Sequence, residues 1–264
     1  MIQRRAGDTN IFITQTAHAW LTGQIGRVWG NEKFQRPLDK GSVYLAAEQH
    51  DIGWAGWEVE PGIDPATGKP FDFMCMPTYD HVDIWTRGSK YMFTQSPYAS
   101  LLVSRHNLHL AKIHDYSRDT PDEVAAMKRF IADEKQRYEM KYRQLSRVPA
   151  YRKLLDEKVM EFHRKQILVW DYLSLLFCMG MEPGNSELVS EVPINSASDT
   201  KMHVSAVSHT SFSMDPWPFA TQRIRLSCDA RRITGRYKTG NEFLNSEDAG
   251  NWQLFEVELI PANH

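Results

Sequence analysis

The pattern of apolar residues changes once along this chain of 264 residues, near Gly180 and Pro183-Gly184. Before that point, apolar residues recur at intervals of three and four, which is typical of amphipathic helices. After it, segments such as Leu254-Phe-Glu-Val-Glu-Leu-Ile260 alternate with a period of two, which is typical of strands. We therefore expect two parts: a mainly α-helical domain over 1–184, and a C-terminal antiparallel β-rich segment over 185–264 packed on it.

Within the first part, a short β-strand or hairpin is expected over residues 1–15, around Gly7-Asp8. The run Thr120-Pro-Asp-Glu123 indicates a helix start, since it offers a capping threonine, a proline in the first turn and two acids. Residues 58–80 read as a long irregular segment, and such segments are often functional loops. The expected helices are 17–29, 43–50, 80–88, 97–113, 120–145 and 151–179.

The composition is that of an ordinary soluble protein, with 42% hydrophobic residues, 24% charged residues and a net charge of −2. This balance gives no electrostatic case for binding nucleic acid or an anionic membrane. No run approaches the roughly 18 apolar residues of a membrane span. Three scattered cysteines indicate neither a disulfide framework nor a zinc motif, so we expect a reducing, cytoplasmic setting. A small-molecule substrate is the expected partner, and homo-oligomerisation is left open.

The adjacent pair His50-Asp51 follows a short apolar helix and precedes Gly53 and Gly56. Successive residues of a helix point about 100° apart, so both side chains can reach one ion only near a helix end. The glycines supply backbone freedom for such a turn. A capping aspartate beside a surface histidine is the simpler interpretation of this pair taken alone.

Other imidazoles and one carboxylate fall on or beside separate expected helices. His18 lies on the apolar stripe of the first helix, and His81 begins a later one. His106 and His109 are three residues apart and share a face, so either can reach a site. Asp171 lies inside the run Ile-Leu-Val-Trp-Asp-Tyr-Leu-Ser-Leu-Leu, where an isolated carboxylate is costly unless a metal or an arginine pairs with it.

Helical bundles build metal sites from inward side chains on facing helices. A donor set of imidazole and carboxylate without thiolate suits Fe, Mn, Ni or Zn. We therefore predict a site for one or two such divalent ions, and two ions bridged by Asp51 would use all the candidates. The predicted ligands are His18, His50, Asp51, His81, His106 and Asp171.

The order of these residues resembles the HD-domain superfamily of metal-dependent enzymes, over about residues 15–180. The segments Thr14-Gln-Thr-Ala-His18, Ala47-Glu-Gln-His-Asp-Ile-Gly-Trp54, Leu102-Val-Ser-Arg-His106 and Asp215-Pro-Trp-Pro-Phe219 resemble those of DUF3891, an uncharacterised family of bacterial proteins. The first resemblance implies an HD-like helical bundle. It also implies a one-metal set of His18, His50, Asp51 and Asp171, with His81 and His106 as the additional ligands of two-metal members.

Three functions are compatible with this pattern. The leading hypothesis is an HD-type phosphohydrolase acting on a small phosphorylated metabolite or nucleotide, because hydrolases are the commoner use of that scaffold. Asp51, His81 and Arg105 would then act in catalysis, with Arg105, Lys69 or Arg87 binding phosphate. The second is a mixed-valent di-iron oxygenase of the HD type. The third is a non-catalytic metal-binding or regulatory protein.

Overall fold

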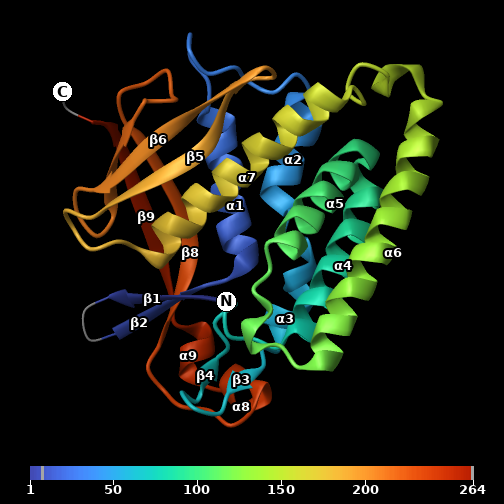
Figure 1. The fold of residues 1–264 in the computed structure, drawn as a ribbon. Helices are drawn as coiled ribbons and strands as arrows, with labels where there is room; N and C mark the ends of the chain where they lie inside the picture. Colours follow the sequence, from blue (N-terminus) through green and yellow to red (C-terminus); the bar gives the residue numbers. More distant parts are fainter. Residues whose placement is uncertain (7–8, 263–264) are drawn as a thin grey trace.

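The computed structural model describes residues 1–6 and 9–262, so the predicted turn at residues 7–8 lies outside the described part of the chain. The long helices occupy one side of the molecule and a large sheet the other, and α1 and α7 lie between the sheet and the remaining long helices (Figure 1). The long helices are α1 (Gln15–Val28), α2 (Lys40–Gln49), α4 (Thr78–Gln95), α5 (Pro97–Lys112), α6 (Pro121–Ser146) and α7 (Glu157–Met179).

α1, α5 and α6 begin within two residues of the predicted positions, whereas α7 begins at Glu157, after the predicted start at Tyr151. The Thr14 side chain accepts a hydrogen bond from the Ala17 amide at the start of α1. At the start of α6, Thr120 and Glu123 form a reciprocal capping box, which satisfies amides that the helix itself leaves unpaired. Shorter helical segments are η1 (Ile52–Trp54), α3 (Ala55–Val59), η2 (Tyr116–Arg118), η3 (Pro149–Tyr151), α8 (Gly240–Leu244) and α9 (Glu247–Gly250).

The strands form one seven-stranded sheet, in the order β1-β2-β8-β9-β7-β6-β5, and a separate two-stranded sheet of β3 and β4. Five of the six neighbouring pairs in the large sheet are antiparallel, and the sixth, β7 with β9, is parallel. The strands are β1 (Ile2–Ala6), β2 (Thr9–Ile13), β3 (Ile63–Asp64), β4 (Lys69–Pro70), β5 (Ser186–Asn195), β6 (Ser198–Ala206), β7 (Ser211–Asp215), β8 (Ile224–Ile233) and β9 (Trp252–Pro261).

The predicted fold class, an HD-like helical bundle with an antiparallel C-terminal segment and a short N-terminal hairpin, is therefore wrong. The N-terminal hairpin and the C-terminal strands belong to one mixed sheet, because β2 pairs with β8 through Asn10 and Ile233. That sheet is a major layer of the protein, with α1 and α7 packed against it. Pairing between strands so far apart in the sequence leaves no trace in local periodicity, which is why the pattern of each strand alone did not indicate it.

A central helix, α7, joins the two layers. Trp170 is fully buried and packs edge-on to Trp29, with ring centroids 6.0 Å apart. Phe177, about two helical turns further along α7, packs against Phe212 of the sheet, with ring centroids 4.7 Å apart. Close approach of α1 requires a residue without a side chain at Gly26, where a Cβ atom would lie 2.8 Å from the Trp170 ring. The helix that carries Asp171 is thus fixed on both sides.

His163 is a buried structural residue of this helix rather than part of a site. Its Nε2 accepts a hydrogen bond from the Leu38 amide at 3.1 Å, and its Nδ1 lies 2.8 Å from the Tyr98 hydroxyl. Burial lowers the pKa of the imidazole to about 4 from its ordinary value of 6.5. The folded protein therefore holds His163 neutral at pH values where the unfolded chain protonates it.

Stability should fall on acidification because of this difference. Above pH 6.5 His163 is neutral in both states, and between pH 6.5 and 4 only the unfolded state takes up its proton. Each pH unit of acidification in that window therefore lowers the free energy of unfolding by about 1.4 kcal/mol through this residue, and by roughly 3 kcal/mol over the whole window. Urea unfolding of the wild type and of His163→Gln, measured from pH 8 to 4, should give a shallower acid slope in the variant. Equal slopes would contradict this role.

Candidate metal centre

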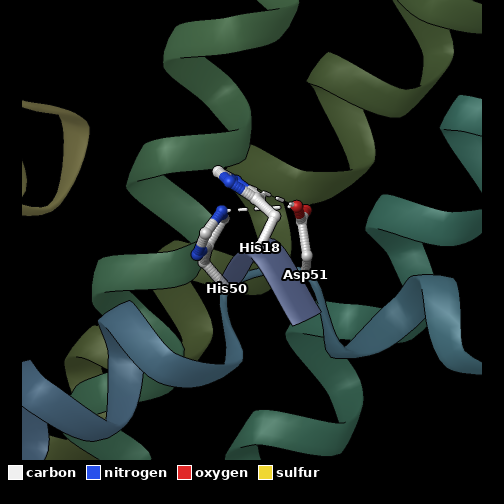
Figure 2. A group of neighbouring side chains, drawn as sticks. All are labelled: His18, His50 and Asp51. Atoms are coloured by element: carbon white, nitrogen blue, oxygen red, sulfur yellow. Dashed lines mark ion pairs between the residues drawn. The ribbon is translucent and has the colours of Figure 1, made fainter. Parts of the chain in front are cut away.

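Three imidazoles and two carboxylates meet inside the helical layer. His18 comes from α1, His50 and Asp51 from the end of α2, His106 from α5 and Asp171 from α7. All five are buried, and Asp51 is the most accessible with 9% of its surface exposed. Figure 2 shows His18, His50 and Asp51 pointing toward one another from two different segments. The sequence predicted each of these five residues as a ligand, and the structure brings them together.

The end of α2 allows two adjacent residues to face one centre. His50 keeps helical dihedral angles, but Asp51 leaves the helix at φ −101° and ψ 18°. The chain then passes close to α4 at Gly53, where a Cβ atom would lie 2.0 Å from the Ile84 carbonyl oxygen. Gly53 is thus needed for close packing. It does not adopt a left-handed conformation. The sequence analysis therefore pointed to the right glycine, but the reason is its close contact with α4 and not its backbone freedom.

The Asp171 carboxylate contacts all three imidazoles. Its Oδ1 lies 2.9 Å from Nε2 of His18 and 3.4 Å from Nε2 of His50. Its Oδ2 lies 3.3 Å from Nε2 of His106. The second carboxylate, Asp51, places Oδ2 at 3.3 Å from Nε2 of His50 and 3.8 Å from Nε2 of His18. All three histidines therefore present the same ring nitrogen to the carboxylates.

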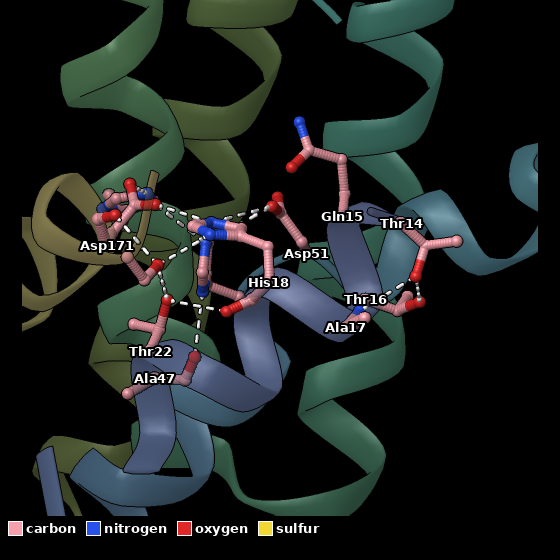
Figure 3. A network of polar contacts seen from close by, with 12 residues as sticks. Thr14, Gln15, Thr16, Ala17, His18, Thr22, Ala47, Asp51 and Asp171 are labelled. Atoms are coloured by element: carbon pink, nitrogen blue, oxygen red, sulfur yellow. Dashed lines mark hydrogen bonds and ion pairs between the residues drawn. The ribbon is translucent and has the colours of Figure 1, made fainter. Parts of the chain in front are cut away.

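A hydrogen bond on the far side of the His50 ring fixes its proton on Nδ1, which donates to the Ala47 carbonyl at 2.9 Å. The neutral His50 ring therefore directs its Nε2 lone pair toward the carboxylates, as metal-binding histidines do. His18 is held on both sides of its ring, because Nδ1 lies 2.6 Å from the Ser174 hydroxyl and Nε2 lies 2.9 Å from Asp171. Figure 3 shows His18, Ala47 and Asp171 within this network.

Lone pairs facing carboxylates repel unless a proton or a cation lies between them. Burial alone would lower the pKa of His50, but the carboxylates of Asp51 and Asp171 outweigh it and hold that pKa well above its ordinary value. Burial would likewise raise the pKa of Asp171, but the charge of His50 holds it well below the ordinary value. The centre is therefore built to hold positive charge.

The surroundings of His106 indicate that protonation of His50 alone does not satisfy all the buried polar atoms of the centre. Within the described part of the chain, neither of its ring nitrogens has a hydrogen-bond partner, although both are buried. Its Nε2 lies within reach of Asp171 at 3.3 Å but lacks the alignment that a hydrogen bond requires. A buried imidazole without partners is costly, and a cation bound between His106 and Asp171 would remove that cost.

Neighbouring donor atoms are close enough to be ligands of a shared ion. Ligands about 2.1 Å from a metal can lie up to about 4 Å apart, and the contacts above span 2.9 to 3.8 Å. Two overlapping groups could each hold an ion, namely His18 with His50 and Asp51, and His50 with His106 and Asp171. The residues thus fit a divalent metal, and their chemistry alone does not select which one.

The sixth predicted ligand, His81, lies apart from these two groups. It sits in α4 with its ring nearly parallel to that of Trp85, at an interplanar angle of 11° and a centroid distance of 5.4 Å. The Trp54 ring meets it edge-on at 5.5 Å. Burial lowers the pKa of His81 to about 4, so the imidazole is neutral. It lines the same cavity as the five donors.

The predicted phosphate-binding residues lie elsewhere. Arg105 binds the Glu157 carboxylate through two nitrogens and lies 3.6 Å from Glu161, in a groove that it shares with His109. The structure therefore places His106, and not its alternative His109, in the centre. Lys69 donates to the Ile233 carbonyl at 2.7 Å. Arg87 pairs with Asp83 on the same helix.

The centre opens into a cavity of about 870 Å³. Residues 71 and 73–78, from the irregular segment predicted as a functional loop, form part of its wall. Ser174 is a residue that sequence reasoning missed, although it lies one helical turn after Asp171 on the same side of α7. Arg118 and its acidic neighbours in the cavity wall were missed as well, since they lie in a short connection without periodicity.

Together these features define a helix-borne histidine and aspartate centre, open to a cavity, that could hold a metal ion. Residues 1–235 match the family DUF3891, described as a protein of unknown function, and the chain belongs to that family. No curated protein and no solved structure matches the chain. These comparisons therefore lend no support to membership of the HD-domain superfamily. Among the helices formed by residues 1–6 and 9–262, none combines the length and apolarity needed to cross a membrane.

Metal binding should raise thermal stability, because an ion that binds only the folded state stabilises it by mass action. Zinc or manganese at 100 times its Kd should add about 2.7 kcal/mol to the unfolding free energy of the wild type. His106→Gln should lose most of the associated rise in Tm, whereas His81→Gln should keep it. Differential scanning fluorimetry with and without EDTA checks this, alongside elemental analysis. Loss of the rise in His81→Gln would place that residue among the ligands.

Proposed function

We propose that this protein is a metal-dependent hydrolase in which His18, His50, Asp51, His106 and Asp171 hold one or two divalent ions, in the two overlapping groups described above. The observation that carries the proposal is the buried imidazole of His106, which lacks hydrogen-bond partners beside the carboxylate of Asp171. The contact from Ala47, which fixes the tautomer of His50, supports it further. A donor set of imidazole and carboxylate suits Fe, Mn, Ni or Zn.

A divalent ion held there would act as a Lewis acid and lower the pKa of a coordinated water toward about 7. The chain's own residues then have separate tasks. Asp51 is the most accessible of the five donors and borders the cavity, so its carboxylate is suited to accept a proton from an attacking water. Asp171 and the histidines are more deeply buried and hold the centre rigid.

Phosphate esters are the bonds that we propose first. The order of His18, His50-Asp51 and Asp171 along the chain resembles that of the HD-type hydrolases described above, and this resemblance is the reason for the choice. Arg118 lines the cavity and can neutralise one negative charge of an ester. Arg105 has no part in this mechanism, because Glu157 and Glu161 hold its guanidinium in a different groove.

Hydrolysis should depend on both the ion and Asp51. Protein loaded in turn with Mn, Zn, Ni or Fe should release nitrophenol from p-nitrophenyl phosphate or its diester, and EDTA should abolish the activity. Asp51→Asn should lower kcat/KM by about 100-fold or more, since it removes a proton acceptor as well as a ligand. Arg105→Gln, a neighbour of His106 outside the centre, should keep both metal and activity.

Two results would contradict the proposal. One is metal-loaded protein that hydrolyses no phosphate ester in a broad panel. The other is hydrolysis that survives EDTA or the Asp51→Asn change. Oxygen uptake by the iron-loaded protein, in place of hydrolysis, would favour the oxygenase hypothesis.

A further inference from the structure

The wall of the cavity next to the metal centre is apolar and largely aromatic. Trp54, with 2% of its surface exposed, packs with Met76 and Ile84 in a small core cluster of its own. Phe71, Phe73 and Trp85 lie against the same cluster. The apolar residues that line the cavity are Trp54, Phe71, Phe73, Met74, Met76, Pro77, Trp85, Leu110, Ile113 and Leu175.

Three rings of this wall are held in fixed orientations. His81 stacks on Trp85 and meets the edge of Trp54, as described above. Trp85 is supported from behind by Phe130 of α6, at a centroid distance of 5.7 Å. Rigid rings lose little freedom when they receive a ligand, and their faces favour another ring in an offset or edge-on arrangement.

The charged residues of the cavity do not suit a strongly anionic ligand. Among the described residues that line it, Arg118 is the only arginine or lysine, and the acids Asp115, Asp119 and Glu123 belong to the same lining. His114 is already paired with Asp119 at 2.8 Å. A ligand with several phosphate groups would meet three carboxylates for one guanidinium, and their repulsion would oppose its binding.

The volume of about 870 Å³ is that of a pocket for a small molecule. We infer that the cavity takes a substrate with an aromatic ring and no more than one strongly anionic group. The ring packs on the wall of Trp54, His81 and Trp85, and the anionic group lies toward the metal centre. This inference rests on the proposed function only for the reaction itself, since the wall would bind the ring whether or not an ester is cleaved.

Two phosphonates test the ring directly. Phenylphosphonate and methylphosphonate carry the same anionic group on a P–C bond that phosphoesterases do not cleave, and they differ only in the ring. Isothermal titration of the zinc-loaded protein should give a Kd for phenylphosphonate at least tenfold lower. Tripolyphosphate should bind no more tightly than phenylphosphonate. Similar Kd values for the two phosphonates, or tighter binding of tripolyphosphate, would overturn the inference.

Substitutions in the wall should reduce the preference for the ring. Trp85→Leu removes an aromatic face but keeps an apolar side chain, and it should bring the ratio of the two Kd values to about threefold or less. Phe73→Leu tests the same wall from the segment that precedes α4, in case Trp85→Leu fails to fold. Trp20→Leu is the matched control, because Trp20 is 51% exposed on α1 and does not line the cavity.

The two proposals fail in different ways. A preference for phenylphosphonate in a protein that hydrolyses no ester would support the ring-binding site and contradict the proposed hydrolase activity. Metal-dependent hydrolysis with equal affinity for both phosphonates would support the hydrolase activity and contradict the ring-binding site. Saturation-transfer NMR from protein to phenyl protons gives a readout that does not depend on any variant.

Discussion

The carboxylate of Asp171 is the point at which the helical layer is joined. Three imidazoles from α1, α2 and α5 converge on its two oxygens, and a buried charge of this kind is stable only while they surround it. Each of those helices must therefore keep its position relative to α7. The interior of the layer is organised around a polar centre, and the apolar packing of Trp29, Trp170 and Phe177 fixes the helix that carries it.

This arrangement explains why so much of the centre could be predicted from the sequence. Asp171 stands out because it interrupts a long apolar run. His50-Asp51 stands out because two adjacent side chains inside a regular helix cannot point at the same ion. Both signals can be recognised from neighbouring residues alone, because each would be energetically unfavourable without a special role. His81 carries similar chemistry and also begins a helix, but its place among tryptophans depends on how α4 packs, which no local pattern records.

The fold itself was less predictable. Capping by Thr14 and by Thr120 with Glu123 depends on residues within one turn, and the helices begin accordingly. The sheet depends on contacts between distant segments: Asn10 lies opposite Ile233, and β7 lies parallel to β9. Alternation within a strand shows which residues share a face, but it does not show the neighbouring strand. The sequence thus indicated strands correctly at both ends of the chain while leaving their union in one sheet unseen.

The contact at Gly53 links the two halves of the cavity. Its backbone lies against Ile84 and Gly88 of α4 with no side chain between them. Two residues before it is Asp51 of the metal centre, and α4 itself carries His81 and Trp85 of the aromatic wall. A displacement of α4 on filling the cavity would therefore be transmitted to Asp51 through packed backbone. The aromatic wall on α4 and the carboxylate of Asp51 thus form a single mechanical unit.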